Sequence, residues 1–177
     1  MNVKKQLLRS RSKNLSREQL RRRYRPDRVR VLFIGEAPPA SGRFFYRGDS
    51  GLYRAVRDTF VRAFPGLEDA NFLQWFCEHE CYLVDLCGTP VDRLDQKNRR
   101  KTCTNGEARL GRIIRQLQPE AIVTLVRSIA PNVRRAQQRA KWNRPYIELP
   151  YPGRWLRHRI EFGKQLVRFL RQIQFVD

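Results

Sequence analysis

The stretch VLFIGEAPPASGRFFYRGDSGL, residues 31–52, decides the fold of this chain. It begins with four apolar residues, 31–34, which predict a strand buried on both faces of a sheet. Glu36 follows one glycine later, and in open α/β sheets the chemistry gathers at the carboxyl ends of the strands. A glycine-containing loop, the aromatic residues 44–46 and a helix beginning near Ser50 complete the stretch. This order of strand, acid, loop, aromatic residues and helix predicts a pocket that binds a flat ring with a carboxylate beside it.

Apolar strands alternate with helical periods along the rest of the chain. The expected strands are 29–34, 81–86, 121–126 and 146–149, and the expected helices are 16–24, one from about 50 to 64, 68–80, one through 110–117, 128–140 and 155–174. We expect a polar loop at 87–104, and we expect Leu156 and Ile160 to face inward from the last helix. Strands separated by helices predict a three-layer αβα sandwich, in which helices cover both faces of a parallel sheet.

The composition points to a polyanionic partner. Lys and Arg number 37 against 17 Asp and Glu, which gives a net charge of +20 and a pI of about 11.1. Such an excess favours nucleic acid, and the planar fork of arginine suits both phosphates and base edges. A solvated basic face without a specific partner is the alternative.

The N-terminal end is the most basic part of the chain. Residues 1–30 carry twelve Lys or Arg and two acids. We predict a basic arm over residues 1–28, with a short helix opened by the capping-box residues Ser16 and Gln19, and an α/β domain over 29–177. The arm would lie along phosphates or, in its first dozen residues, be disordered.

No apolar run approaches the roughly 20 residues that a membrane span needs, and the N-terminus lacks the apolar segment of a secretion signal. These two features predict a cytoplasmic protein, associated with the nucleoid through DNA. We expect a monomer with no obligate protein partner.

The residues GEAPP at 35–39 and GRFFY at 42–46 resemble the uracil-DNA glycosylase superfamily. The likeness is to its iron–sulfur group, whose first motif reads GEAPG, a spacer and then GxPFVG. The resemblance implies four parallel strands in the order 2-1-3-4. It also implies a DNA glycosylase that flips a damaged or modified base out of single- or double-stranded DNA and hydrolyses its N-glycosidic bond, leaving an abasic site. Such an enzyme would serve repair or defence against modified foreign DNA.

The resemblance assigns roles to residues of the first motif. Glu36 stands at the glutamate of GEAPG and is the candidate catalytic acid, with a salt-bridged carboxylate as the alternative. Phe45 aligns with the phenylalanine that packs on the base, with core packing as the alternative. Gly35, Ala37 and Tyr46 are expected to line the base pocket. Members whose motif reads GQDPYH have a water-activating Asp at the position of Ala37, so their mechanism does not carry over directly.

Asp85 ends the second expected strand, where uracil glycosylases commonly have an Asn that pairs with the edge of uracil. An ionised carboxylate only accepts hydrogen bonds, so it repels the uracil O4 carbonyl and accepts from the exocyclic amine of cytosine. We therefore take Asp85 as a second catalytic acid and expect a cytosine-derived base. A protonated Asp85 would still read uracil, and an alignment anchored on Cys87 would put the family Asn at Leu83. Asp49 is a further acid in the loop after the aromatic residues.

The second family motif, HPSP, corresponds to residues 149–152, which read LPYP. Leu149 replaces the histidine that donates to the leaving uracil, and this removes a main electrostatic contribution. Tyr151 is expected to line the base pocket, and either Tyr151 or Arg154 would supply the missing donor. The residues expected to contact DNA are Arg43, Arg47, Arg154 and Trp155, the last with a core anchor as its alternative. The loss of the histidine keeps a second function open, a non-catalytic nucleic-acid-binding module on the same fold.

The chain has four cysteines, Cys77, Cys81, Cys87 and Cys103. The family's iron–sulfur cluster joins two N-terminal cysteines to a later pair separated by fifteen residues. Cys87 and Cys103 show the later spacing, but the N-terminal pair is absent and Cys77 and Cys81 are placed on a helix just before a strand. We predict reduced thiols, no iron–sulfur cluster, no metal and no other cofactor.

Overall fold

The computed structural model describes residues 15–153 and 155–175. Its centre is one sheet of four parallel strands in the order β2-β1-β3-β4. The strands are β1 (Val31–Gly35), β2 (Cys81–Asp85), β3 (Ala121–Thr124) and β4 (Tyr146–Glu148). This sheet confirms the expected fold class and strand order.

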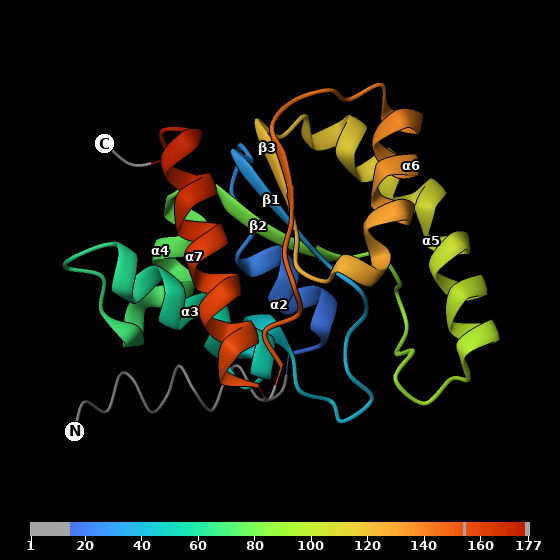
Figure 1. The fold of residues 1–177 in the computed structure, drawn as a ribbon, viewed down its shortest axis with the longest axis horizontal. Coiled ribbons are helices and arrows are strands. Elements are labelled where there is room, and N and C mark those ends of the chain that lie inside the picture. The colour runs from blue at the N-terminus through green and yellow to red at the C-terminus, as the bar shows by residue number, and fades with distance from the viewer. Residues whose placement is uncertain (1–14, 154, 176–177) are drawn as a thin grey trace.

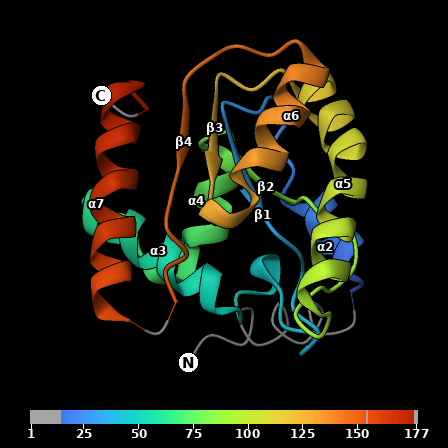
Figure 2. The same ribbon diagram turned by 45° about the vertical axis from the view of Figure 1, so that its right-hand side comes forward.

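Helices cover both faces of the sheet. They are α2 (Arg17–Arg23), α3 (Gly51–Ala63), α4 (Phe72–Glu78), α5 (Gln96–Leu117), α6 (Ala130–Ala140) and α7 (Leu156–Gln172), with short 3-10 turns at Phe45–Arg47, Asp69–Asn71 and Arg127–Ile129. In Figures 1 and 2, α5 and α6 lie together on one side of the sheet, and α3, α4 and α7 lie on the other. The predicted three-layer αβα sandwich is confirmed. No helix of the described residues is long and apolar enough to cross a membrane.

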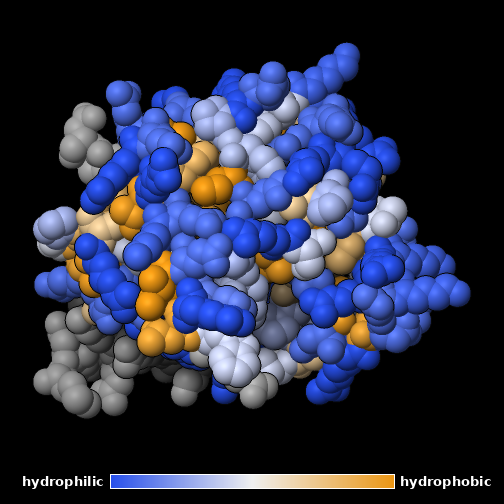
Figure 3. All heavy atoms as spheres, viewed as in Figure 1, coloured by the Kyte–Doolittle hydropathy of each residue, from blue (hydrophilic) through white to orange (hydrophobic). Residues whose placement is uncertain are grey.

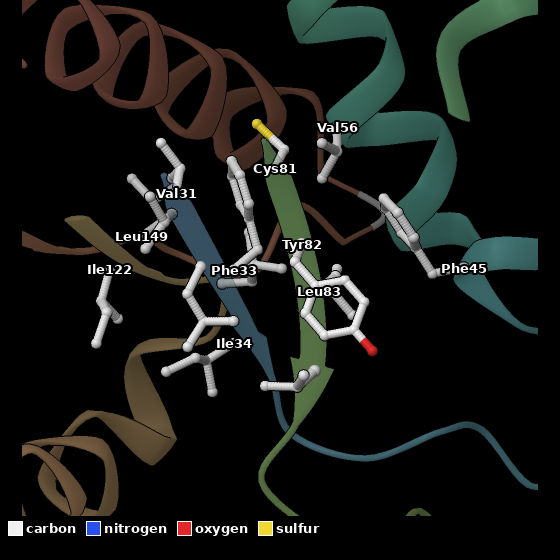
Figure 4. Close-up of a cluster of buried hydrophobic side chains, with 14 of the residues drawn as sticks. Val31, Phe33, Ile34, Phe45, Val56, Cys81, Tyr82, Leu83, Ile122 and Leu149 are labelled. Atoms are coloured by element: carbon white, nitrogen blue, oxygen red, sulfur yellow. The ribbon is translucent and has the colours of Figure 1, made fainter. Parts of the chain in front are cut away.

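The core forms around β1, whose five residues are all buried. The ring centroid of Phe33 lies 5.2 Å from that of Phe76 on α4 and 6.1 Å from that of Phe60 on α3. Because strand residues alternate between faces, Leu32 and Ile34 turn to the α5–α6 side. Figure 4 shows these apolar side chains around β1 and β2. The run at 31–34 is apolar throughout because both of its faces are covered.

Tyr46 and α2 close the free edge of the sheet at β2. The Tyr46 hydroxyl donates to the carbonyl of Leu83 at 3.0 Å and accepts from the N–H of Leu83 at 2.6 Å. The ring of Tyr24 stacks on Tyr46 with centroids 5.8 Å apart, and Leu20 of α2 is fully buried. The capping box of Ser16 and Gln19 is confirmed at the start of α2. Backbone groups of an edge strand need such partners, so Tyr46 protects the sheet.

The polar loop expected at 87–104 is wrong over its second half. Helix α5 begins at Gln96, where the side chain of Asp95 accepts a hydrogen bond from the N–H of Asn98 at 3.0 Å. Residues 92–101 are all exposed, because the first turns of α5 project beyond the sheet. Because these residues have no buried face, they show no apolar residues at helical spacing, and the hydrophobic periodicity of the sequence does not reveal the start of the helix.

The inward placement of Leu156 and Ile160 is also wrong. Both side chains are exposed, Leu156 at 70% and Ile160 at 45%, while Phe162, Leu166 and Leu170 bury the inner face of α7. The remaining differences are at element ends. The helix expected at 68–80 is a 3-10 turn followed by α4, and the helix expected at 128–140 begins with another such turn. Cys81 begins β2, as the expected strand 81–86 has it, and does not lie on the helix before that strand.

Gly106 lies where α5 passes over the end of β2. A Cβ at this position would overlap the carbonyl oxygen of Leu86, a backbone atom that cannot step aside. Overpacking of this kind costs about 1–3 kcal/mol, which exceeds the roughly 1 kcal/mol that alanine gains over glycine in a helix. We expect Gly106→Ala to lower the free energy of unfolding by about 1–2 kcal/mol in urea titrations. The matched control is Gly88→Ala, with no atom within 4 Å of the new Cβ, and an equal midpoint for both variants would contradict the close contact.

Candidate active site

The carboxyl ends of the strands form one rigid edge. The sheet's hydrogen bonding continues past the strands, with Leu86 N–H donating to the Gly35 carbonyl and Cys87 N–H donating to the Glu36 carbonyl, both at 2.8 Å. On the other side of β1, Leu125 N–H donates to the Ile34 carbonyl at 2.9 Å. The backbones that carry the two candidate acids are thereby held side by side.

Asp85 is a buried carboxylate, 5% exposed. Arg21 of α2 donates to its Oδ2 at 3.1 Å, and Arg109 of α5 donates to its backbone carbonyl. Burial raises the pKa of the Asp85 carboxyl, and the positive charges of Arg21 and Arg109 oppose that rise. A Cβ on Gly35 would lie 2.8 Å from Oδ1 of Asp85, so glycine makes room for this carboxylate.

Glu36 is held from the other layer by α5. Arg99 Nε donates to Oε1 of Glu36 at 2.6 Å, and a second nitrogen of Arg99 pairs with Oε2. The hydrogen bond to Glu36 raises the pKa of Arg99, so the guanidinium stays charged. The thiol of Cys103 lies 3.8 Å from Oε1. Glu36 is therefore a salt-bridged carboxylate, and a fork-to-fork pair of this kind fixes the plane of the carboxylate.

Phe45 lies in the aromatic core in this structure. Its ring meets those of Tyr53, Phe72 and Phe76 at centroid distances of 5.8, 6.4 and 5.6 Å, and it is 3% exposed. Figure 4 shows Phe45 beside β2 and the start of α3. A base could stack on this ring only after its covering side chains moved, so the stacking role stays a prediction.

A cleft of about 870 Å³ opens at the same edge of the sheet. Its walls come from the start of α3, the turn after β3 and the segment that follows β4. Tyr151 and Trp155 line it and are 52% and 66% exposed, whereas Leu149, at the position of the family histidine, is fully buried. Glu36 and Asp85 do not line this cleft.

The other predicted residues are spread along this edge. Arg43 is exposed, Ala37 is half-buried, and Arg154 lies outside the described residues. Arg47 donates to the carbonyls of Gly42 at 2.9 Å and Leu15 at 3.3 Å, which ties the aromatic loop to the chain before α2. The carboxylate of Asp49 accepts from the N–H of Phe44 at 2.7 Å, and this bond shapes the same loop.

Three arginines of the site were not predicted: Arg21, Arg99 and Arg109. Each contacts a candidate acid or its backbone, and each comes from a helix other than the one that follows β1. In a chain with so many arginines, no local signal separates these three from the rest. Only the packing of α2 and α5 against the strand ends identifies them.

The four cysteines are free thiols, and Cys87 and Cys103 lie 3.6 Å apart at their sulfurs. Burial raises the pKa of Cys87 to about 12, so the sulfur stays protonated. Among residues 15–153 and 155–175, no three His, Cys, Asp or Glu side chains come together in a way that could hold a metal ion.

Comparison with known proteins gives one family. The model of the family described as "Uracil DNA glycosylase superfamily" matches residues 22–174. No curated protein matches the chain. The match contains every strand and both motifs, and it begins one residue after Arg21.

Proposed function

Because the chain belongs to the uracil-DNA glycosylase superfamily, we propose that it is a DNA glycosylase that flips out a base and hydrolyses the bond between base and deoxyribose. The observation that carries the proposal is the placement of Asp85 and Glu36 at adjoining strand ends, each held by an arginine. Hydrolysis of an N-glycosidic bond passes through an oxocarbenium-like state, which carboxylates stabilise. Single-stranded and double-stranded DNA are both candidate substrates.

Asp85 supports recognition of an amino-bearing base. Arg21 occupies its Oδ2, and no described residue donates a hydrogen bond to its Oδ1. Oδ1 itself occupies the room that a side chain at Gly35 would take. An acceptor without a partner at a buried position matches the exocyclic amine of a cytosine-derived base better than the O4 carbonyl of uracil.

Glu36 is assigned to the sugar. Its carboxylate would face the developing positive charge and hold the attacking water, while the pair with Arg99 fixes its orientation. Tyr151, in the second motif and exposed at the cleft, is the described group assigned as donor to the leaving base in place of the family histidine. Phe45 would stack on the base once the side chains that cover its ring have moved, and Tyr46 would bound the base beside it.

A second candidate function is a non-catalytic nucleic-acid-binding module. Two observations favour it: Glu36 is engaged by Arg99, and the buried Leu149 cannot donate a hydrogen bond to a leaving base. The net charge of +20 supports nucleic-acid binding under either function.

The test is abasic-site cleavage on single- and double-stranded DNA that carries uracil, hypoxanthine, xanthine, 5-hydroxymethylcytosine or glucosylated cytosine. We expect strand breaks after alkali at a cytosine derivative and none at uracil. Cleavage at uracil would support the glycosylase function and contradict the base-recognition role proposed for Asp85. If all DNA of the panel stayed intact while tight binding was retained, the non-catalytic binding module would be the supported function.

A further inference from the structure

A second groove runs along the outside of the molecule between α3 and α7 and encloses about 740 Å³. Five cationic side chains line it: Arg62 from α3, and Arg159, Lys164, Arg168 and Arg171 from α7. Arg159 also lines the cleft at the sheet edge, so the two hollows adjoin. Together the cleft and the groove make one path from the residues around Tyr151 to the far end of α7.

The charge of this groove has no internal partner among the described residues. No carboxylate lines it, and the acids of α3 and α7 nearest to it pair elsewhere, Asp58 with Arg57 and Glu161 with Arg127. Five cations within one groove repel one another unless an anion lies between them. The groove therefore matches a polyanion that extends over several charges.

The lining of the groove is apolar in part. Ile160 and Val167 line it together with Gly163, which has no side chain. Among the described residues, five large hydrophobic side chains are exposed. Four of them, Tyr151, Trp155, Leu156 and Ile160, fall within ten positions at the end nearest the first cleft. Figure 3 shows apolar side chains set among strongly hydrophilic ones on the face that carries α7.

A surface that combines cations with exposed apolar and aromatic side chains favours single-stranded over double-stranded nucleic acid. A duplex presents phosphates outward and keeps its bases stacked inside, so apolar residues on its outer surface gain little. A single strand exposes both phosphates and base faces, and grooves that bind it combine positive charge with stacking side chains.

We propose that the α3–α7 groove binds single-stranded DNA and continues the cleft that Tyr151 and Trp155 line. Arg62, Lys164, Arg168 and Arg171 would contact successive phosphates. Unpaired bases would lie against Ile160 and Val167, and Trp155 would stack at the mouth. The identity of the ligand as DNA rests on the proposed function.

The test measures equilibrium binding, which does not depend on base removal. Fluorescence anisotropy with an unmodified single-stranded oligonucleotide of 20 nucleotides compares Arg168→Gln/Arg171→Gln with Arg112→Gln/Arg139→Gln. The control pair lies exposed on α5 and α6, on the other layer, and removes the same charge. Glutamine preserves the helices. We expect the groove variant to bind roughly tenfold more weakly and its salt slope to fall by about 1.4, since each phosphate contact on a single strand contributes about 0.7.

A third variant tests the apolar part of the lining. Ile160→Gln should weaken the single strand about threefold and leave a duplex of the same length unchanged, since stacking and apolar contact serve only unpaired bases. Equal losses for the groove and control variants would overturn the proposal, as would equal losses of single strand and duplex. The groove would belong to an acidic protein instead if the groove variant, unlike the control variant, stopped binding a polyglutamate peptide while its oligonucleotide binding stayed intact. If the protein releases no base from any DNA of the panel but binds the oligonucleotides as expected, the proposed glycosylase activity is wrong and the proposed binding of single-stranded DNA in the groove stands.

Discussion

Glu36→Gln should nearly abolish base release, slowing abasic-site formation by roughly 10²- to 10⁴-fold under single-turnover conditions. The amide has the size and shape of the carboxylate but no charge, so it can neither hold the attacking water as a base nor stabilise the positive sugar. Arg99 keeps a hydrogen-bond acceptor in the amide oxygen, and DNA affinity should change less than about twofold because no phosphate contact is lost.

Glu161→Gln is the matched control for this variant. Glu161 is also paired with an arginine, Arg127, but it belongs to α7 and not to a strand end. Its substitution should leave the rate of base release unchanged. A Glu36→Gln protein with the full wild-type rate would remove Glu36 from the chemistry.

Asp85→Asn should change which base is excised. Arg21 donates at the Oδ2 position, so we expect the amide oxygen there and the NH₂ group at the Oδ1 position. The NH₂ group donates to a base carbonyl and offers an amino-bearing base no acceptor. A good pair of hydrogen bonds discriminates by about 1–3 kcal/mol, so the ratio of kcat/KM for cytosine derivative over uracil should fall roughly 5- to 150-fold.

The pH dependence provides a second reading of the same residue. Burial raises the pKa of Asp85, so its carboxylate takes up a proton at a higher pH than an exposed aspartate does. The wild-type preference for an amino-bearing base should therefore weaken as the pH falls through that raised pKa, and the asparagine variant should show no such change. An unaltered base ratio in Asp85→Asn at every pH would mean that Asp85 does not contact the base.

The layer architecture could be predicted because the buried strands are apolar throughout and most helices carry one clear apolar stripe. The strand order came from the family resemblance of the two motifs and is confirmed. The periodicity misled at α7, where a second apolar stripe through Leu156 and Ile160 lies beside the inward one. The spacing of apolar residues shows that they share one face of a helix, but it does not show whether another part of the protein covers that face.

The candidate site could be predicted only in part. Glu36 and Asp85 were found because acids at strand ends are visible in a linear sequence. Their partners were not, because Arg99 lies in exposed turns of α5 that carry no apolar period and Arg21 lies in a segment assigned to a basic arm. Long-range ion pairs depend on how helices dock, and that docking is set by buried contacts such as Leu20 and Gly106.

The central claim is tested most directly by detecting the free base. The wild-type protein would be incubated with single-stranded DNA containing each modified base, and mass spectrometry would quantify released base and abasic DNA in the same sample. The account predicts equal amounts of a free cytosine-derived base and abasic strand, and neither with Glu36→Gln. No released base from any of these strands, from a protein that still binds them, would contradict it.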